Sequence, residues 1–148
     1  MGIDNKTVLT GISTRGRASV RLESKKQYTT GLFIADIQHM PGNICGSWPA
    51  FWTVDLQDWP HGGEIDIMEN INEQAYNQET LHTLPGCKLT QGYGNANRHL
   101  ESANCDTSVN YNSGCGVLDD DSVKQPSFGT PFSTKGGGIY AMVRKAVL

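Results

Sequence analysis

The feature that most limits the fold of this chain is a series of short β-favouring runs separated by turn formers. Residues 19–24 alternate polar and apolar side chains, as a half-buried strand does. Further runs rich in strand-favouring residues are 31–37, 50–54, 80–83 and 139–143. No segment keeps an amphipathic helical period over about ten residues or more. The pattern predicts an all-β fold, in which the Gly- and Asn-rich stretch 86–135 is a long loop held by disulfides.

Length and charge narrow the class of protein. The chain has 148 residues and a formal net charge of −3, so we expect one domain, residues 1–148, that is a monomer. Its few, scattered Lys and Arg side chains do not make the basic patch that nucleic-acid binding needs. The sequence has no run of about 20 apolar residues to span a bilayer, and its start lacks a signal-peptide pattern. A neutral partner is expected, and neither nucleic acid nor membrane.

Four cysteines occur without a C-x-x-C pair: Cys45, Cys87, Cys105 and Cys115. This spacing does not suit a zinc ribbon or a thioredoxin-like motif, so disulfides are the expected use. The sequence does not choose among the three possible pairings. A bond within the stretch from Cys87 to Cys115 would suit the loop-rich composition there.

Three acidic residues lie inside an apolar, strand-like segment at residues 62–70: Glu64, Asp66 and Glu69. Alternate side chains of a regular strand share a face, so Glu64 and Asp66 would point one way and Glu69 the other. One extra residue at positions 67–68 would form a β-bulge and bring Glu69 onto the first face. We therefore expect a bulged strand with three carboxyl groups on one face.

Such a set of carboxyl groups suits a retaining glycosidase. That mechanism needs two carboxyl groups about 5–5.5 Å apart, one ionised to attack and one protonated to donate. Like charges on one face raise the pKa of at least one member, and Asp66 can hydrogen-bond the nucleophile. The alternative is an acidic strand face open to solvent, or a cation site. For an arbitrary acidic strand this alternative is the more common one, because acidic side chains are usually exposed.

The flanking sequence favours the glycosidase. Residues 45–54 read CGSWPAFWTV, residues 64–69 read EIDIME and residues 80–83 read TLHT, with further matching stretches at 19–22, 39–41 and 136–142. In this order, over about residues 11–142, they resemble the fungal endo-1,3(4)-β-glucanases, or laminarinases, of glycoside hydrolase family 16.

The resemblance implies a fold, a site and a compartment. The fold is an all-β jelly-roll β-sandwich of the concanavalin A-like lectin and glucanase type. Glu64 corresponds to the nucleophile, Asp66 to the assisting acid and Glu69 to the general acid/base. Family members are extracellular and substantially longer, so the resemblance makes this chain a partial catalytic domain whose sandwich is incomplete at the C-terminal end.

Candidate substrate-binding residues surround the acidic strand. Sugar rings pack their C–H faces on aromatic rings, so Trp48, Trp52 and Trp59 are candidates, although large aromatics more often pack in a core. Trp59 is the best of them, because it precedes the acidic strand in a turn, whereas Trp52 suits the core equally well. His82 is a candidate through the resemblance and through its ability to keep an acid ionised. Asn43 could touch a sugar hydroxyl, but a turn role suits it better.

Three functions remain open at this point. The first is endo-hydrolysis of β-1,3 or mixed-linkage β-1,3-1,4 glucan without a cofactor or metal. The second is glucan binding without catalysis on the same fold, and the third is transglycosylation of wall glucan through the same covalent intermediate. The intact acidic set favours the first, with β-glucan polysaccharide as the partner.

Overall fold

The computed structural model describes residues 4–10, 16–90, 98–120 and 125–145. Strands predominate among them, and helix is confined to the 3-10 turn η1 (Asn110–Asn112) and the short α1 (Gly129–Thr134). The strands are β1 (Gly31–Ile37), β2 (Ala50–Val54), β3 (Glu64–Glu69), β4 (Gln78–His82), β5 (Arg98–Ser102), β6 (Cys115–Asp119) and β7 (Gly138–Arg144). The expected all-β fold is confirmed.

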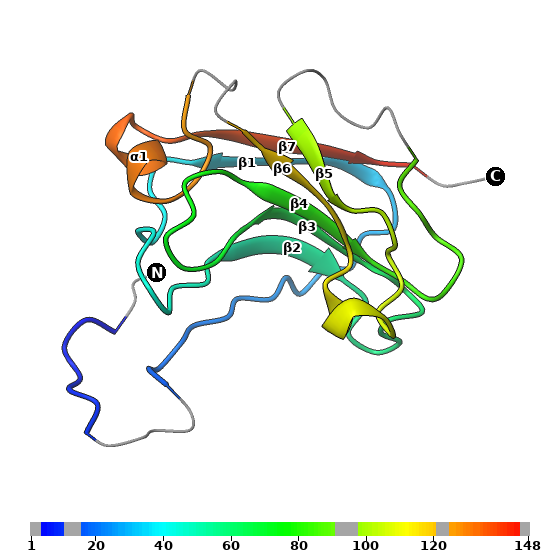
Figure 1. Ribbon diagram of the computed structural model, residues 1–148, viewed down its shortest axis with the longest axis horizontal. Coiled ribbons are helices and arrows are strands. Elements are labelled where there is room, and N and C mark those ends of the chain that lie inside the picture. Colours follow the sequence, from blue (N-terminus) through cyan, green and yellow to red (C-terminus); the bar gives the residue numbers. More distant parts are fainter. Residues whose placement is uncertain (1–3, 11–15, 91–97, 121–124, 146–148) are drawn as a thin grey trace.

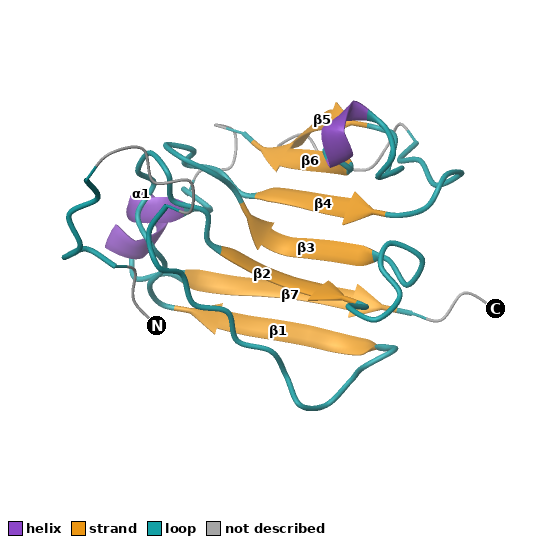
Figure 2. Ribbon diagram, turned by 90° about the horizontal axis from the view of Figure 1, so that it is seen from below, coloured by secondary structure: helices purple, strands orange, loops and turns teal. Residues whose placement is uncertain are grey.

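The strands form two antiparallel sheets that face each other (Figure 1). The larger sheet has five strands in the order β2-β3-β4-β6-β5, and the smaller one pairs β1 with β7. Figure 2 shows β3 near the middle of the larger sheet, with neighbours on both sides. The acidic strand therefore has a hydrogen-bonded partner on each edge, which fixes its register.

A hydrophobic cluster joins the two sheets next to α1. Its buried members are Met40, Met68, Phe128 and Phe132, and Ile37, Phe51 and Tyr140 pack against them. Burying a side chain of this size contributes roughly 1.5–3 kcal/mol. Because Met68 points into this cluster, the following residue, Glu69, points to the opposite face of the sheet.

A second region between the sheets is partly polar. It contains a partly open cavity of about 340 Å³ whose apolar lining includes Ile65, Ile67, Leu81, Val117 and Met142. The Arg98 side chain reaches the same region, where Nη1 donates to Glu79 Oε2 at 2.7 Å and Nε donates to Asp119 Oδ1 at 2.8 Å. Burial raises the pKa of Glu79, and the guanidinium of Arg98 opposes that rise. Apolar packing and an ion cluster thus both contribute to this part of the interior.

Two expectations about elements are wrong. Residues 19–24 are exposed and form no strand, because their backbone pairs with no strand of either sheet. Instead, Arg21 reaches over the ring of Trp52, with its guanidinium carbon 4.6 Å from the ring centroid. The stretch 86–135 is also not a single loop, since β5 and β6 pair within it and add two strands to the large sheet. Its residues 91–97 and 121–124 lie outside the described part of the chain.

A disulfide lies within the stretch where one was expected. Cys105 and Cys115 are bonded and fully buried. Cys45 and Cys87 are free and exposed. The bond ties the segment that contains η1 to the start of β6.

Candidate active site

Strand β3 carries the bulge that the sequence predicts. Asp66 pairs with Thr80 of β4 and Glu69 pairs with Gln78, so three steps along β3 match two steps along β4. The extra residue returns Glu69 to the face of Glu64 and Asp66. The predicted bulge is thereby confirmed.

The side chain of Asn77 completes the hydrogen bonding of the bulge. Its Oδ1 accepts from the backbone N–H of Glu69 at 3.0 Å, and its Nδ2 donates to the carbonyl of Ile67 at 3.0 Å. Asn77 is only 1% exposed, so these backbone groups have exchanged water for a protein partner. A bulge disrupts the ladder, and a buried polar group left unpaired costs roughly 1–3 kcal/mol. Sequence reasoning missed Asn77, because nothing in the local pattern distinguishes it from a turn Asn.

Asp66 lies at the centre of the acidic set and is 1% exposed. The Nε2 atom of His82 is 3.3 Å from Asp66 Oδ2, and the His82 Nδ1 atom is 3.0 Å from Asn112 Oδ1. The hydrogen bond to Asp66 is the largest of the effects that raise the pKa of His82, and the one to Asn112 adds to it. With an oxygen acceptor beside each ring nitrogen, the surroundings of His82 favour the protonated form of the imidazole.

Glu64 receives a hydrogen bond from the turn that precedes β3. The indole Nε1 of Trp59 donates to Glu64 Oε2 at 2.5 Å. Burial raises the pKa of Glu64, and this hydrogen bond opposes the rise because it stabilises the carboxylate. The contact joins the predicted subsite residue Trp59 to the predicted nucleophile.

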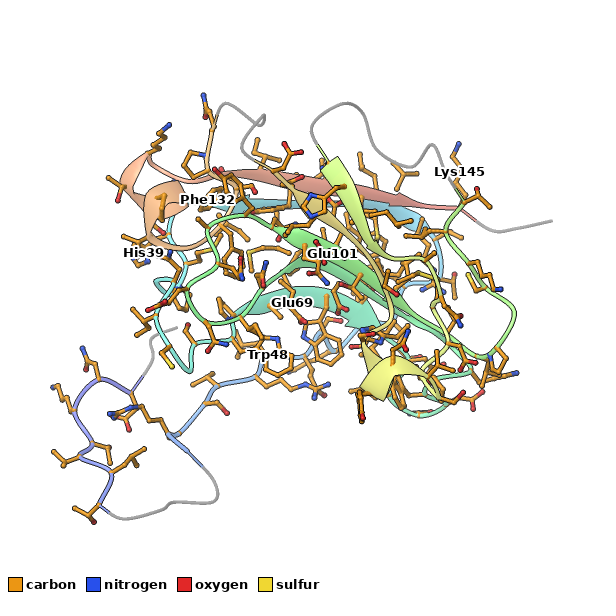
Figure 3. The ribbon with its side chains drawn as sticks, viewed as in Figure 1. His39, Trp48, Glu69, Glu101, Phe132 and Lys145 are labelled. Carbon is orange, nitrogen blue, oxygen red and sulfur yellow. A yellow bond between two sulfur atoms is a disulfide. The ribbon has the colours of Figure 1, made fainter. Side chains whose placement is uncertain are left out.

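Glu69 is the acid with the most displaced protonation equilibrium. Burial and then the charge of Asp66 raise the pKa of Glu69 to about 7, while a hydrogen bond from Trp48 opposes the rise. Figure 3 shows Glu69 and Trp48 on the side of the large sheet that faces away from β1 and β7. A carboxyl group with this pKa is protonated in mildly acidic solution and can donate its proton.

The other predicted residues fall into two groups. Trp52 pairs with Asp66 across β2 and β3, so its ring lies on the acidic face and not in the core. Asn43 ties loops together: its Oδ1 accepts from Thr130 N–H at 3.1 Å, and its Nδ2 donates to the Glu73 carbonyl at 3.3 Å. The structure therefore brings Trp52 to the acids and gives Asn43 the turn role. A substrate contact for Asn43 stays a prediction.

The acidic face also has residues that sequence reasoning missed. Arg21, which stacks on Trp52, is close enough to lower the pKa of Glu64 slightly. Asn112 reaches His82 from η1, 30 positions further along the chain. No local pattern could have found either contact, because both depend on how distant segments are brought together.

Residues 4–10, 16–90, 98–120 and 125–145 contain no group of three or more His, Cys, Asp or Glu side chains placed to hold a metal ion. None of the helices in these same segments has the length and apolar character required to cross a membrane.

These features define a class of protein. A β-sandwich with paired Glu side chains on one sheet face, an Asp between them and tryptophans beside them has the architecture of a glycoside hydrolase.

Comparison with known proteins identifies the family. Residues 1–147 match the family described as "XgeA-like, catalytic GH16 domain". The chain is 46% identical over 142 residues to the endo-1,3(4)-β-glucanase xgeA of Emericella nidulans, and 43% identical over 144 residues to an endo-1,3(4)-β-glucanase of Arthroderma benhamiae. These matches cover 96% and 95% of this chain but only 21% and 30% of the relatives.

Solved structures agree with the sequence matches. Laminarinase 16A of Phanerochaete chrysosporium, solved with β-glucans in its donor and acceptor sites, aligns with a TM-score of 0.72 at 41% identity. That alignment covers 82% of this chain and 39% of the laminarinase. An elongating family 16 β-1,3-glucosyltransferase aligns with a TM-score of 0.75 at 45% identity, covering 88% of this chain and 41% of that one.

The chain belongs to glycoside hydrolase family 16. Its sandwich is of the jelly-roll type that the sequence predicts. It spans about a fifth to a third of the length of the curated relatives named above.

Proposed function

We propose that this protein is a retaining endo-hydrolase of β-1,3 and mixed-linkage β-1,3-1,4 glucans. The observation that carries the proposal is the bulge in β3, which puts Glu64, Asp66 and Glu69 on one face with the pKa of Glu69 raised to about 7. Family membership supports it, as do the relatives described as endo-1,3(4)-β-glucanases.

The reaction has two displacements. In the first, the carboxylate of Glu64 attacks the anomeric carbon while Glu69 donates its proton to the leaving glycosidic oxygen, so the C–O bond breaks and a glycosyl ester forms. In the second, Glu69, now a carboxylate, takes a proton from the attacking water, and Glu64 leaves as a carboxylate. Each displacement inverts the anomeric carbon, so the product retains its configuration.

The neighbouring groups have defined tasks in this scheme. The Trp59 indole stabilises the ionised form of Glu64 before attack. Asp66, in contact with His82 at 3.3 Å, lies between the two Glu side chains and orients the nucleophile. The exposed rings of Trp48 and Trp59 offer apolar faces to glucosyl residues on either side of the cleaved bond.

Transglycosylation is the second candidate function. The structural similarity to an elongating β-1,3-glucosyltransferase, at 45% identity, specifically favours it. The chemistry differs only in the acceptor of the second displacement, which is a sugar hydroxyl in place of water. Product size separates the two, because hydrolysis only shortens laminari-oligosaccharides, whereas transfer also lengthens them.

Reducing-sugar release from laminarin tests the proposal. The purified protein is expected to release reducing sugar, and the Glu64→Gln and Glu69→Gln variants are expected to lose at least about 10³-fold in rate. Glu73→Gln is the matched control, since Glu73 is exposed and its side chain is outside the acidic set. A folded parent protein that binds laminarin without cleaving it would favour the non-catalytic alternative and contradict the hydrolase.

We also propose that the protein is extracellular and monomeric. The buried Cys105–Cys115 disulfide supports the first of these, because such bonds persist in oxidising compartments. A single self-contained acidic face supports the second, because no residue from another copy is needed to complete the catalytic set.

A further inference from the structure

The turn η1 has an unusual backbone. Asn110, Tyr111 and Asn112 all have positive φ, at 49°, 55° and 60°. Asn tolerates this left-handed region, but Tyr does not, because its Cβ approaches the backbone too closely. Consecutive residues in this region are uncommon, and they persist only where the surroundings hold them in place. Strain of this kind points to a function for the residue that bears it.

Three contacts hold the turn against the acidic face. The Cys105–Cys115 disulfide closes the segment that contains it, and Asn112 Oδ1 lies 3.0 Å from His82 Nδ1. Gly114 has a φ of +66° and packs so closely that a Cβ there would lie 2.6 Å from the Leu81 carbonyl oxygen and 2.9 Å from the His82 ring. The turn is therefore fixed to β4 at the residue that binds Asp66.

Tyr111 is fully exposed within this fixed turn, at 107% of its reference accessibility. The turn, drawn in yellow in Figure 1, lies on the side of the large sheet away from β1 and β7, and Figure 2 shows it from that side in front of β5 and β6. That side is the one on which the acids lie. An aromatic ring at this position gains nothing from burial in the free protein, so its apolar faces are available to a ligand.

We propose that Tyr111 is a glucan-binding residue whose ring packs against a glucosyl unit at the rim of the acidic face. The inference rests on the proposed function, since it names a further contact for the same substrate. The left-handed turn presents the ring, and the Asn112 contact to His82 sets its position relative to the acids.

Three substitutions of Tyr111 separate binding from folding. Tyr111→Ala removes the ring and keeps the strain, Tyr111→Gly removes both, and Tyr111→Phe keeps the ring. For laminari-oligosaccharides, the Ala and Gly variants are expected to raise KM about 3- to 10-fold with kcat changed less than about twofold, while Phe stays within about twofold of the parent. Tyr111→Gly is also expected to raise the melting temperature, because glycine relieves the strain.

The control is Tyr28→Ala, which removes another exposed tyrosine, one that packs edge-on against Phe33 of β1. Its KM should match the parent. An unchanged KM in Tyr111→Ala and Tyr111→Gly would overturn the inference and leave the proposed function intact, and so would a Phe variant as weak as Ala. A parent protein that cleaves no β-glucan would instead overturn the proposed function, and this inference with it.

Discussion

Glu69 shows how position alone changes the chemistry of a residue. On an exposed strand face its carboxyl group would be ionised at neutral pH. Here burial and the charge of Asp66 raise its pKa to about 7, while Glu64, five positions earlier, keeps the stabilising indole of Trp59. These different surroundings suit the two proposed roles, with Glu69 as proton donor and Glu64 as nucleophile.

The pH dependence of kcat/KM should report this difference. Activity needs Glu69 protonated and Glu64 ionised, so the alkaline limb is expected near pH 7, and the acid limb is expected above the usual Glu range near 4.5. Trp48→Phe removes a hydrogen bond that lowers the pKa of Glu69, so it should move the alkaline limb to higher pH. An alkaline limb at about pH 9 or above would contradict the assignment of Glu69 as the acid.

The same pKa affects stability with a defined sign. Because the pKa of Glu69 is higher in the folded protein than in the unfolded chain, an ionised Glu69 destabilises the fold. This loss of folding free energy is absent below about pH 4.5 and complete above about pH 7. The Glu69→Gln variant has no carboxylate and so avoids this destabilisation. We expect the free energy of unfolding to rise by about 1–3 kcal/mol at pH 8, after discounting for partial exposure, and to change little at pH 4. Urea titrations at both pH values measure this, and an equal effect at both would contradict the burial argument.

At the scale of elements, the bulge in β3 decides whether Glu69 shares a face with Glu64 and Asp66. A regular strand would direct Glu69 into the hydrophobic cluster and leave Met68 on the acidic face. The bulge reverses this, and Asn77 supplies the hydrogen bonds that the interrupted ladder lacks.

Asn77→Ala tests this role. It leaves the Glu69 N–H and the Ile67 carbonyl without their partner, so we expect a loss of about 2–4 kcal/mol in the free energy of unfolding. Because the Glu69 backbone also loses its anchor, kcat should fall at least tenfold even under conditions where the variant is folded. Gln74→Ala, at an exposed position, is the control. Normal kcat in a folded Asn77→Ala protein would show that the bulge holds its shape without this side chain.

The Cys105–Cys115 disulfide also stabilises the arrangement of elements, because it ties the η1 segment to β6. It joins residues separated by 10 positions, and closing a loop of this length stabilises a fold by about 2–3 kcal/mol in the chain-entropy model. The Cys105→Ala, Cys115→Ala double variant should lose about that much in chemical denaturation. Its KM for glucan should also rise, because the η1 turn loses an anchor. Unchanged stability would mean that packing around β6 alone fixes this segment.

The sequence predicts local elements well and distant contacts poorly. Residues 31–37 and 50–54 become strands as expected, and the parity of the acids alone predicts the bulge. Residues 19–24 have a strand pattern, but their backbone pairs with no strand of either sheet. Residues 98–102 and 115–119 become strands inside a loop-like composition, because each supplies the other's hydrogen bonds. Pairing of this kind depends on tertiary structure, so a local sequence pattern cannot predict it.

At the scale of the whole molecule, the two faces of the sandwich differ. The large sheet presents the acids, the tryptophans and η1 on one side. The small sheet presents exposed apolar side chains on the other: Leu32, Ile34, Ile139 and Val143. In the described residues nothing covers these side chains. The proposed catalytic acids thus lie on one face of the large sheet, within the single strand β3.

Chemical rescue with azide tests the central claim most directly, namely that Glu64 is the nucleophile and Glu69 the acid/base. In Glu64→Gly, azide should fill the space and attack an activated laminari-oligosaccharide to give the α-glycosyl azide. In Glu69→Ala, azide should attack the glycosyl ester on Glu64 and give the β-glycosyl azide. The opposite anomer from each variant would contradict the assignment. So would a result in which the parent protein cleaves glucan but azide restores activity to neither variant.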